Sequence, residues 1–226
     1  MTIHRDLQEL EEKGYLKKTM GGAIKISDFL VQNETPFAKK LKLKIDEKVA
    51  IAKKALEYIN NGDSIMIDAG TTNFLLVKEI VKSDIKDLTV ITNNIIAQIE
   101  LAKKEDVKII ATGGTVRRSS YSSTGIIAER MLEKIIADKA FITTKGVSQE
   151  GDIYDPTEDE GAMKQAYLKR ARGKILIIDS SKFGILGLHI IANVRDFDVL
   201  ITDNNIQKKY LGYLRDLDLK LEIVGV

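Results

Sequence analysis

The chain has 226 residues, of which 44% are hydrophobic and 30% charged, so it can bury the core of one full domain beside a small appendage. It has no cysteine and only two histidines, which excludes disulfides and cysteine nucleophiles and leaves a zinc site few ligands. The net charge of +2 does not by itself indicate a nucleic-acid partner. Since no apolar run has the length of a membrane span and no secretory leader opens the chain, we expect a cytoplasmic protein without a membrane partner, a metal or a cofactor.

The first 26 residues predict a helix followed by a β-hairpin. Thr2 can cap a helix over residues 3–13, whose apolar residues recur at helical spacing. Strands are expected at residues 15–20 and 23–26, joined by a tight two-glycine turn. A unit of this size cannot bury its own apolar face, so we treat residues 1–26 as part of a larger module.

Residues 27–44 are expected to form a linker, and from residue 45 short β-branched runs alternate with amphipathic segments. Strands are predicted at residues 64–68, 88–92, 107–111, 139–143, 175–179, 199–203 and 219–224. Helices are predicted at residues 45–61, 72–81, 94–103, 126–136, 158–170 and 205–214. Continuous apolar strands separated by helices indicate an α/β domain over residues 45–226, with a mainly parallel sheet covered on both faces.

Seven lysines gather in residues 36–54, beside a body that is close to neutral. Such a basic segment would suit a phosphate backbone, and a solvated linker and helix face would show the same composition. Both interpretations stay open.

Polar residues follow the predicted strands, at the sheet edge where open parallel sheets bind ligands. After the first strand come Asp68, Gly70, Thr71, Thr72 and Asn73, in which a glycine and two hydroxyls open a helix and could cradle an anion. An ordinary capped turn without a ligand would look the same. Later strand ends carry similar residues, namely Thr92 and Asn93, Gly113 and Gly114, and Thr143 and Thr144. Together they favour a pocket for an anionic, hydroxyl-rich small molecule.

A helix N-terminus contributes roughly 0.3–1 kcal/mol to a nearby anion and up to ~2 in a sheltered site, whereas micromolar affinity needs about 8 kcal/mol. Charged side chains are therefore required, and the candidates are Arg117, Lys145, Lys164 and Lys182. Glu160 lies four residues before Lys164 on a predicted helix, a spacing that more often gives an exposed ion pair. Asp138 precedes its strand, so we expect it at the opposite edge of the sheet.

Several motifs resemble those of DeoR-type transcriptional regulators. Residues 2–7, residues 10–14 and the run Gly21-Gly22-Ala23 resemble the recognition helix and wing of that family. The body resembles its effector domain in Asp68-x-Gly-Thr-Thr72, Leu88-Thr-Val-x-Thr-Asn93, Gly113-Gly114, Asp138-x-Ala-Phe141, Lys145-Gly146, Glu160-x-x-x-Lys164 and Asp179-x-Ser-Lys-Phe183. The resemblance runs through nearly the whole chain, in order.

The resemblance implies an effector domain that folds like ribose-5-phosphate isomerase and CoA-transferase, and that binds a phosphorylated sugar. The chain would then regulate a sugar-utilisation operon, by repression in most relatives, and would act on operator DNA as a homodimer or homotetramer. Carried over by position, the phosphate loop is Gly70, Thr71, Thr72 and Asn73. The rest of the pocket would be lined by Asp68, Thr92, Asn93, Gly113, Gly114, Arg117, Lys145, Glu160, Lys164 and Lys182.

The sequence departs from the family pattern at its start. It begins inside the recognition helix, so we expect the chain by itself to bind operator DNA poorly. His4 stands where the family commonly has arginine, and Met20 where the wing often has histidine. The residues expected to contact DNA in the intact protein are Thr2, His4, Arg5, Lys17, Lys18, Gly21 and Gly22.

The main alternative is an aldose–ketose isomerase, in which Glu160 would move the proton while Lys164 or Lys182 polarises the carbonyl. The residues around the fourth strand provide only Asp138, not a paired acidic cluster, and a recognition helix has no use in a free-standing isomerase. A third interpretation, an anion-binding scaffold without regulatory output, leaves residues 1–26 unexplained. We therefore expect a regulator without enzymatic activity.

Overall fold

The computed structural model describes residues 2–12, 16–19, 22–25 and 36–226. At the N-terminus, helix α1 (Thr2–Glu12) precedes an antiparallel hairpin of β1 (Leu16–Thr19) and β2 (Gly22–Lys25), in which Lys17 pairs with Ile24. The predicted helix and hairpin are thus confirmed. Gly21 of the predicted turn, residue 26 of the predicted hairpin and residues 27–35 of the predicted linker lie outside the described residues.

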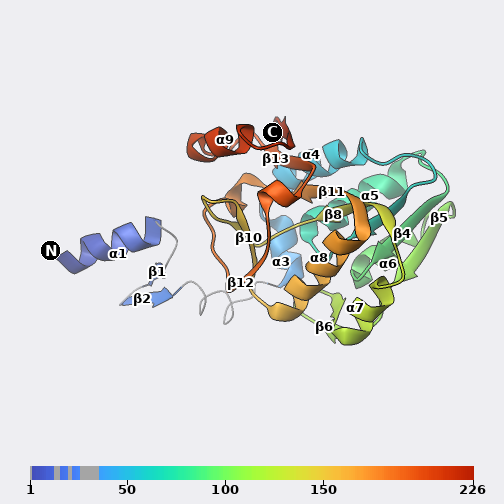
Figure 1. Cartoon of the computed structure of the whole chain (residues 1–226), viewed down its shortest axis with the longest axis horizontal. Coiled ribbons are helices and arrows are strands. Elements are labelled where there is room, and N and C mark those ends of the chain that lie inside the picture. Colours follow the sequence, from blue (N-terminus) through green and yellow to red (C-terminus); the bar gives the residue numbers. More distant parts are fainter. Residues whose placement is uncertain (1, 13–15, 20–21, 26–35) are drawn as a thin grey trace.

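The body is built on a seven-stranded sheet, in the order β14-β13-β11-β8-β3-β4-β5 (Figure 1). All neighbouring strands in it are parallel. The strands are β3 (Ser64–Ile67), β4 (Leu88–Thr92), β5 (Val107–Ala111), β8 (Ala137–Ile142), β11 (Ala171–Ile177), β13 (Val199–Asp203) and β14 (Lys220–Val224). Each of the seven predicted strands is present, which confirms the mainly parallel α/β fold class.

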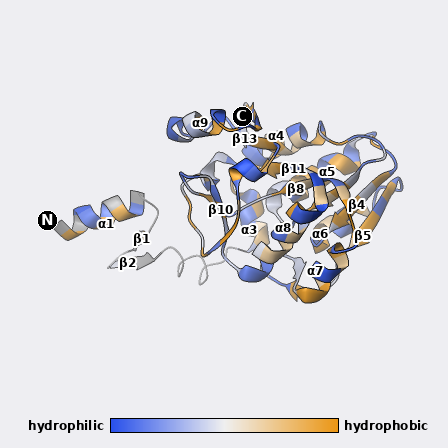
Figure 2. Cartoon of the chain, in the orientation of Figure 1, coloured by the Kyte–Doolittle hydropathy of each residue, from blue (hydrophilic) through white to orange (hydrophobic). Residues whose placement is uncertain are grey.

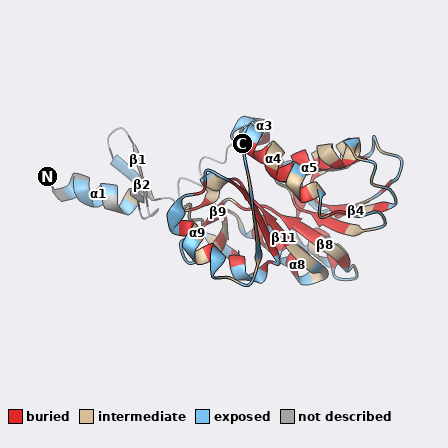
Figure 3. Ribbon diagram, turned by 90° about the horizontal axis from the view of Figure 1, so that it is seen from above, coloured by how far each residue is buried: buried red, intermediate tan, exposed pale blue. Residues whose placement is uncertain are grey.

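Helices cover both faces of this sheet. One face packs against α4 (Ile45–Leu56), α5 (Thr71–Lys82) and α6 (Ile95–Leu101), and the other against α7 (Ile126–Leu132), α8 (Glu158–Arg170) and α9 (Lys208–Arg215). Both faces must be covered because successive side chains of a strand point to opposite faces. In β3, Ile65 and Ile67 point into the first layer, and Met66 between them points into the second. The inner strands are accordingly buried on both sides, whereas the edge strands β5 and β14 are partly exposed, and the buried residues of the helices are mainly apolar (Figures 2 and 3).

Shorter elements complete the fold at the carboxyl ends of the strands. They are α3 (Phe37–Lys42), the hairpin of β6 (Thr115–Arg117) and β7 (Ser122–Thr124), and a small antiparallel sheet of β12 (His189–Asn193), β10 (Asp152–Asp155) and β9 (Gly146–Val147). The sequence did not predict these elements. Among the described residues, no helix is long and apolar enough to cross a membrane.

The order of the strands places a topological switch point between β3 and β8, in the middle of the sheet. From β3 the chain proceeds outward through β4 to β5, whereas from β8 it proceeds the other way through β11 and β13 to β14. The loops that leave β3 and β8 therefore diverge, and open α/β sheets bind ligands in the crevice at such a switch point.

Candidate anion-binding site

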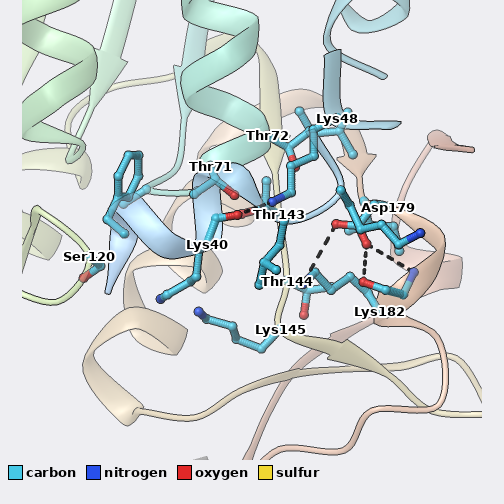
Figure 4. Close-up of a pocket in the computed structure, with 18 of the residues that line it drawn as sticks. Lys40, Lys48, Thr71, Thr72, Ser120, Thr143, Thr144, Lys145, Asp179 and Lys182 are labelled. Carbon is cyan, nitrogen blue, oxygen red and sulfur yellow. Dashed lines mark hydrogen bonds and ion pairs between the residues drawn. The ribbon is translucent and has the colours of Figure 1, made fainter. Parts of the chain in front are cut away.

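A cavity of about 110 Å³ lies at this switch point, beyond the carboxyl ends of β3, β8 and β11 (Figure 4). Its walls come from five parts of the chain: α3 with the start of α4, the start of α5, the β6–β7 hairpin, the loop after β8 with α8, and the loop after β11. The lining residues include Phe37, Lys40, Leu43, Lys44, Lys48, Gly70, Thr71, Thr72, Ser120, Thr143, Thr144, Lys145, Glu160, Lys164, Asp179, Ser181 and Lys182.

The N-terminus of α5 opens toward this cavity. The first N–H groups of a helix have no acceptor within the helix, and no side chain caps this one. Gly70 is required there because the side chain of Thr143 lies where a Cβ atom would be. Thr71 and Thr72 follow at the cavity wall, so the loop after β3 brings helix amides and hydroxyls to one place. Such a helix end favours an anion.

Three lysines from other elements, Lys48, Lys145 and Lys182, line the same cavity as this helix end. Lys48 of α4 is only 3% exposed, and its Nζ donates a hydrogen bond to the backbone oxygen of Lys40 at 2.6 Å. Burial, with further repulsion from Lys182 and Lys145, lowers the pKa of Lys48 to about 8 despite the attraction of Asp179. Burial also lowers the pKa of Lys182, whose Nζ is 3.9 Å from the carboxylate of Asp179. Among the described residues, neither Lys48 nor Lys145 forms an ion pair.

The floor of the cavity is a buried ionic cluster around Lys164. Its Nζ lies 2.6 Å from Asp155 Oδ2 and 3.3 Å from Asp68 Oδ2, and all three residues are buried. Burial raises the pKa values of Asp68 and Asp155, and Lys164 opposes this rise. The two carboxylates in turn hold the pKa of Lys164 above its usual value, against the effect of burial. Asn73 also donates hydrogen bonds to Asp68 and to the backbone oxygen of Phe141.

Glu160 occupies the wall next to this floor. Burial would raise its pKa, but Lys164, Ser120 and Arg117 lower it to about 2. The Nε of Arg117 is 3.5 Å from Glu160 Oε1, and the hydroxyl of Ser122 donates to the same oxygen at 3.2 Å. The prediction of an exposed Glu160–Lys164 ion pair is wrong, because both side chains are about 5% exposed and turn inward toward carboxylates and hydroxyls from other strands.

Seven of the predicted ligand-binding residues line the cavity, namely Gly70, Thr71, Thr72, Lys145, Glu160, Lys164 and Lys182. Three more support it from behind: Asp68 and Asn73 in the floor, and Arg117 beside Glu160. Asp138 lies at the amino-terminal end of β8, on the side of the sheet away from the cavity, as expected. There it accepts hydrogen bonds from Ser64 and pairs with Arg172.

Four predicted residues do not line the cavity, and contact between them and a ligand stays a prediction. Gly113 and Gly114 follow β5, the edge strand three positions from β8, and neighbouring strands are about 4.8 Å apart. Thr92 and Asn93 are buried at the end of β4. The hydroxyl of Thr92 donates to the Ile67 backbone oxygen, and Asn93 exchanges hydrogen bonds with Ser123 of β7. The hydrogen bonds of Asn93 join the end of β4 to the hairpin that carries Ser120.

Sequence reasoning missed the wall formed by α3 and α4. Residues 36–44 were assigned to a linker, yet Phe37 is buried and its ring contacts those of Phe74 and Tyr121, with centroids 5.7 and 5.9 Å apart. The lysine-rich composition of residues 36–54 was the available signal, and three of those lysines, Lys40, Lys44 and Lys48, line the cavity. Asp155 was also missed, because it lies in the small sheet that no pattern predicted.

The residues proposed to contact DNA lie on the N-terminal elements. Thr2, His4 and Arg5 are in α1, Lys17 and Lys18 in β1, and Gly22 begins β2, whereas Gly21 is outside the described residues. Arg5 and Gly22 are exposed. Within the described part of the chain, no three His, Asp or Glu side chains are grouped so as to hold a metal ion.

The structure thus joins a helix-and-hairpin segment to an α/β domain with a cationic cavity. The DeoR C terminal sensor domain matches residues 43–204, and the DeoR-like helix-turn-helix domain matches residues 1–29. The chain therefore belongs to the DeoR family of transcriptional regulators.

Individual relatives agree with this assignment. The uncharacterized HTH-type transcriptional regulator YulB of Bacillus subtilis is 36% identical over 99% of this chain and 84% of its own length. HTH-type transcriptional regulator GolR of Listeria innocua is 34% identical, over 98% and 86%. The lactose phosphotransferase system repressor of Lactococcus lactis is 34% identical, over 93% and 82%. Among solved structures, ribose 5-phosphate isomerase A of Neisseria gonorrhoeae is similar over 60% of this chain and 52% of its own, with 15% identity and a TM-score of 0.45. At that score the likeness says nothing of activity.

Proposed function

We propose that the chain regulates a sugar-utilisation operon, most simply as a repressor, and that a phosphorylated sugar bound in the cavity controls it. The observation that carries this proposal is that Lys48, Lys145 and Lys182 line one cavity together with the open N-terminus of α5. The similarity to a lactose phosphotransferase system repressor supports the same class of operon.

The charges in the cavity favour a single phosphate group. Several other charged side chains have partners nearby: Lys164 pairs with Asp68 and Asp155, Glu160 with Arg117, and Lys44 with Glu47 at 2.7 Å. Asp179 lies 3.9 Å from Lys182 and so offsets part of the positive charge of the three lysines. Charge-assisted hydrogen bonds contribute about 1.5–3 kcal/mol each, and a sheltered helix N-terminus up to ~2 kcal/mol. Three lysine contacts and the helix end therefore reach the about 8 kcal/mol that micromolar affinity requires.

Other residues that line the cavity, Glu160, Ser120 and Thr144, suit the hydroxyl groups of a sugar. Glu160 is held ionised by its neighbours, so it can only accept hydrogen bonds, as a sugar hydroxyl would offer. Ser120 and Thr144 are further polar groups on the walls. A ligand with a phosphate at one end and hydroxyls along its chain would match both halves of the cavity.

The same geometry argues against an isomerase. A general base works best with a pKa near the working pH, but the pKa of Glu160 is about 2 because Lys164, Ser120 and Arg117 stabilise its charge. Lys164 is itself engaged by two buried carboxylates. We therefore propose binding without conversion.

In this proposal residues 1–26 belong to the DNA-binding module, residues 27–44 connect it to the effector domain, and residues 45–226 bind the sugar phosphate. Residues 36–44 of the connection also contribute to the cavity wall, so the ligand and the connection share a surface. Operator DNA is the second partner, and a homodimer or homotetramer would match paired operator half-sites.

The test combines binding with turnover. The chain is mixed with ribose 5-phosphate, several hexose phosphates, the parent sugars and inorganic phosphate, and thermal unfolding and product formation are both followed. At a hundredfold excess over the Kd, a bound ligand adds about 2.7 kcal/mol of stability. We expect stabilisation by at least one sugar phosphate, none by its parent sugar, and no conversion. Lys169→Ala changes an exposed lysine of α8 that does not line the cavity, and it should respond to each ligand like the wild type. Conversion at enzyme-like rates would instead establish the isomerase.

A further inference from the structure

The wall of the cavity that faces Lys48 is not part of the α/β layers. It is α3, which directly follows residues 26–35 and so stands between the DNA-binding segment and the effector domain along the chain. Phe37, Lys40 and Leu43 of this region line the cavity. A ligand in the cavity would therefore touch the connection itself.

Helix α3 is held to the body at its two ends. At the first end, the Phe37 N–H donates to the Ser119 backbone oxygen at 3.1 Å, and the Phe37 ring packs against Phe74 and Tyr121. At the second end, the Nζ of Lys48 donates to the Lys40 backbone oxygen at 2.6 Å. The first contact is largely apolar and lies against the ring cluster, whereas the second is made by a cation that also lines the ligand cavity.

The turn between α3 and α4 consists of two residues, Leu43 and Lys44. Lys44 joins the two helices with a φ of 55°, a left-handed conformation that a residue with a side chain rarely adopts. Leu43 just before it is extended and 55% exposed. A change in the position of α3 relative to α4 would act through these two residues, against the contacts of Phe37, of Leu41 with the core, and of Lys48.

An ammonium group has three donors, and Lys48 uses one of them on the Lys40 carbonyl. The group is almost fully buried and lies beside Thr71 and Thr72 at the N-terminus of α5 (Figure 4). We propose that Lys48 couples effector binding to the DNA-binding segment, by donating at once to the ligand's anionic group and to the end of α3, so that an occupied site fixes α3 against the body. This inference rests on the proposed function, since it requires an anion in the cavity.

The coupling has a clear thermodynamic meaning. A ligand shifts a conformational equilibrium only by its difference in affinity for the two arrangements. With α3 docked, Lys48 is held at the cavity by its carbonyl acceptor and meets the anion ready oriented. With α3 displaced, Lys48 loses that acceptor, and the wall residues Phe37 and Leu43 leave the ligand. The anion therefore favours the docked arrangement, and docking of α3 favours the anion by the same factor.

The experiment uses inorganic phosphate as the probe and hydrogen–deuterium exchange of residues 37–44 as the readout, with chloride at equal ionic strength as the reference. Phosphate should slow exchange in this segment of the wild-type chain. Lys48→Met should bind phosphate roughly tenfold or more weakly. At matched occupancy it should lose the slowing at residues 37–44 while keeping it in α5. The matched control is Lys182→Met, which weakens phosphate binding without touching α3 and should retain the slowing at equal occupancy.

Three results would count against the coupling. If phosphate does not bind the wild-type chain, the proposed function fails and the coupling fails with it. If phosphate binds but residues 37–44 exchange as before, only the coupling is overturned. The same holds if Lys48→Met shows the full slowing. Lys48→Met should fold, because it replaces a buried charge by an apolar side chain of similar length; Lys48→Gln, measured in the same way, provides the second uncharged variant.

Discussion

Lys164 and Lys48 line the same cavity but lie in opposite electrostatic surroundings. Lys164 has two carboxylates within 3.3 Å, and these keep its pKa above the usual value although it is buried. Lys48 is buried with a backbone carbonyl as its hydrogen-bond acceptor, and burial, with added repulsion from Lys182 and Lys145, lowers its pKa to about 8. The floor of the cavity, formed by Lys164, Asp68 and Asp155, is thus internally neutralised. The three lysines Lys48, Lys145 and Lys182, which we call the rim, carry an excess of positive charge. The comparison suggests that the floor maintains the structure and the rim binds the ligand.

The largest effect should come from breaking the floor. Lys164→Met leaves Asp68 and Asp155 buried without their cation, and loss of one partner from a buried ion pair typically costs 3–5 kcal/mol. We expect the free energy of unfolding, measured by urea denaturation, to fall by about this amount. Lys145→Met is the matched change, because Lys145 lines the same cavity without an ion pair among the described residues, and it should alter the free energy of unfolding by no more than about 1 kcal/mol. Equal losses in the two variants would contradict the division between floor and rim.

The second effect concerns the helix end at which floor and rim meet. In Gly70→Ala the new Cβ would collide with the side chain of Thr143, so the loop after β3 must shift, at a cost of about 1–3 kcal/mol. Phosphate binding should be lost as well, because the amides of α5 move. Gly212→Ala in α9 is the control, since no described atom lies near its added methyl group, and it should stabilise the chain slightly. Calorimetric titration with phosphate that still shows wild-type affinity in Gly70→Ala would remove this helix end from the site.

How far the sequence predicts these features depends on how local their causes are. The strands and helices of the body follow from continuous apolar runs alternating with amphipathic segments, and all seven strands were predicted. Gly70, Thr71 and Thr72 were also predicted, because the residue after a strand and before a helix has a known place in such a fold. The small sheet was not, because β9 has two residues and β10 four, too short to show a period.

The charged residues show where sequence reasoning ends. Glu160 and Lys164 were correctly placed on one helix, but their spacing could not show that each turns inward to partners from other elements. Asp155 belongs to β10, so its contact with Lys164 depends on a pairing of strands distant in sequence. Lys48 is one lysine among seven in a basic segment, and its burial depends on α3 packing over it. Conversely, Gly113 and Gly114 resembled the other strand ends, but their distance from the cavity follows from strand order.

A third, smaller effect tests the rim directly. Lys182→Ala removes one cation that faces the anion site, and a charge-assisted contact contributes about 1.5–3 kcal/mol, so ligand affinity should fall tenfold or more. Thermal shifts with a stabilising sugar phosphate should shrink accordingly, while the melting temperature without ligand stays close to that of the wild type. Lys208→Ala, an exposed lysine of α9, is the control and should keep the full shift. Undiminished stabilisation in Lys182→Ala would exclude this lysine from the site.

The smallest effect is a dependence of the affinity for phosphate on pH, which we expect to come from the lysines of the rim. In the empty site the pKa of Lys48 is lowered to about 8 by burial and by neighbouring lysines, and a bound anion would raise it again. Binding above pH 8 must therefore take up a proton, and affinity for phosphate should fall as the pH rises from 8, by up to about tenfold per unit. Below the second pKa of phosphate the affinity should fall too, because the anion takes up a proton and loses its second negative charge.

Glu160, in the wall next to the floor, should not contribute to this profile. Glu160, with a pKa of about 2, stays ionised throughout, so neither limb can come from it. Calorimetric titrations between pH 5 and 10 in buffers of different ionisation enthalpy would measure both affinity and proton uptake. In Lys48→Met the alkaline limb should become shallower without vanishing, since the pKa of Lys182 is lowered in the same direction. A wild-type affinity that stays constant above pH 8 would mean that Lys48 does not face the anion, and the rim would then have to be redrawn around Lys145 and Lys182.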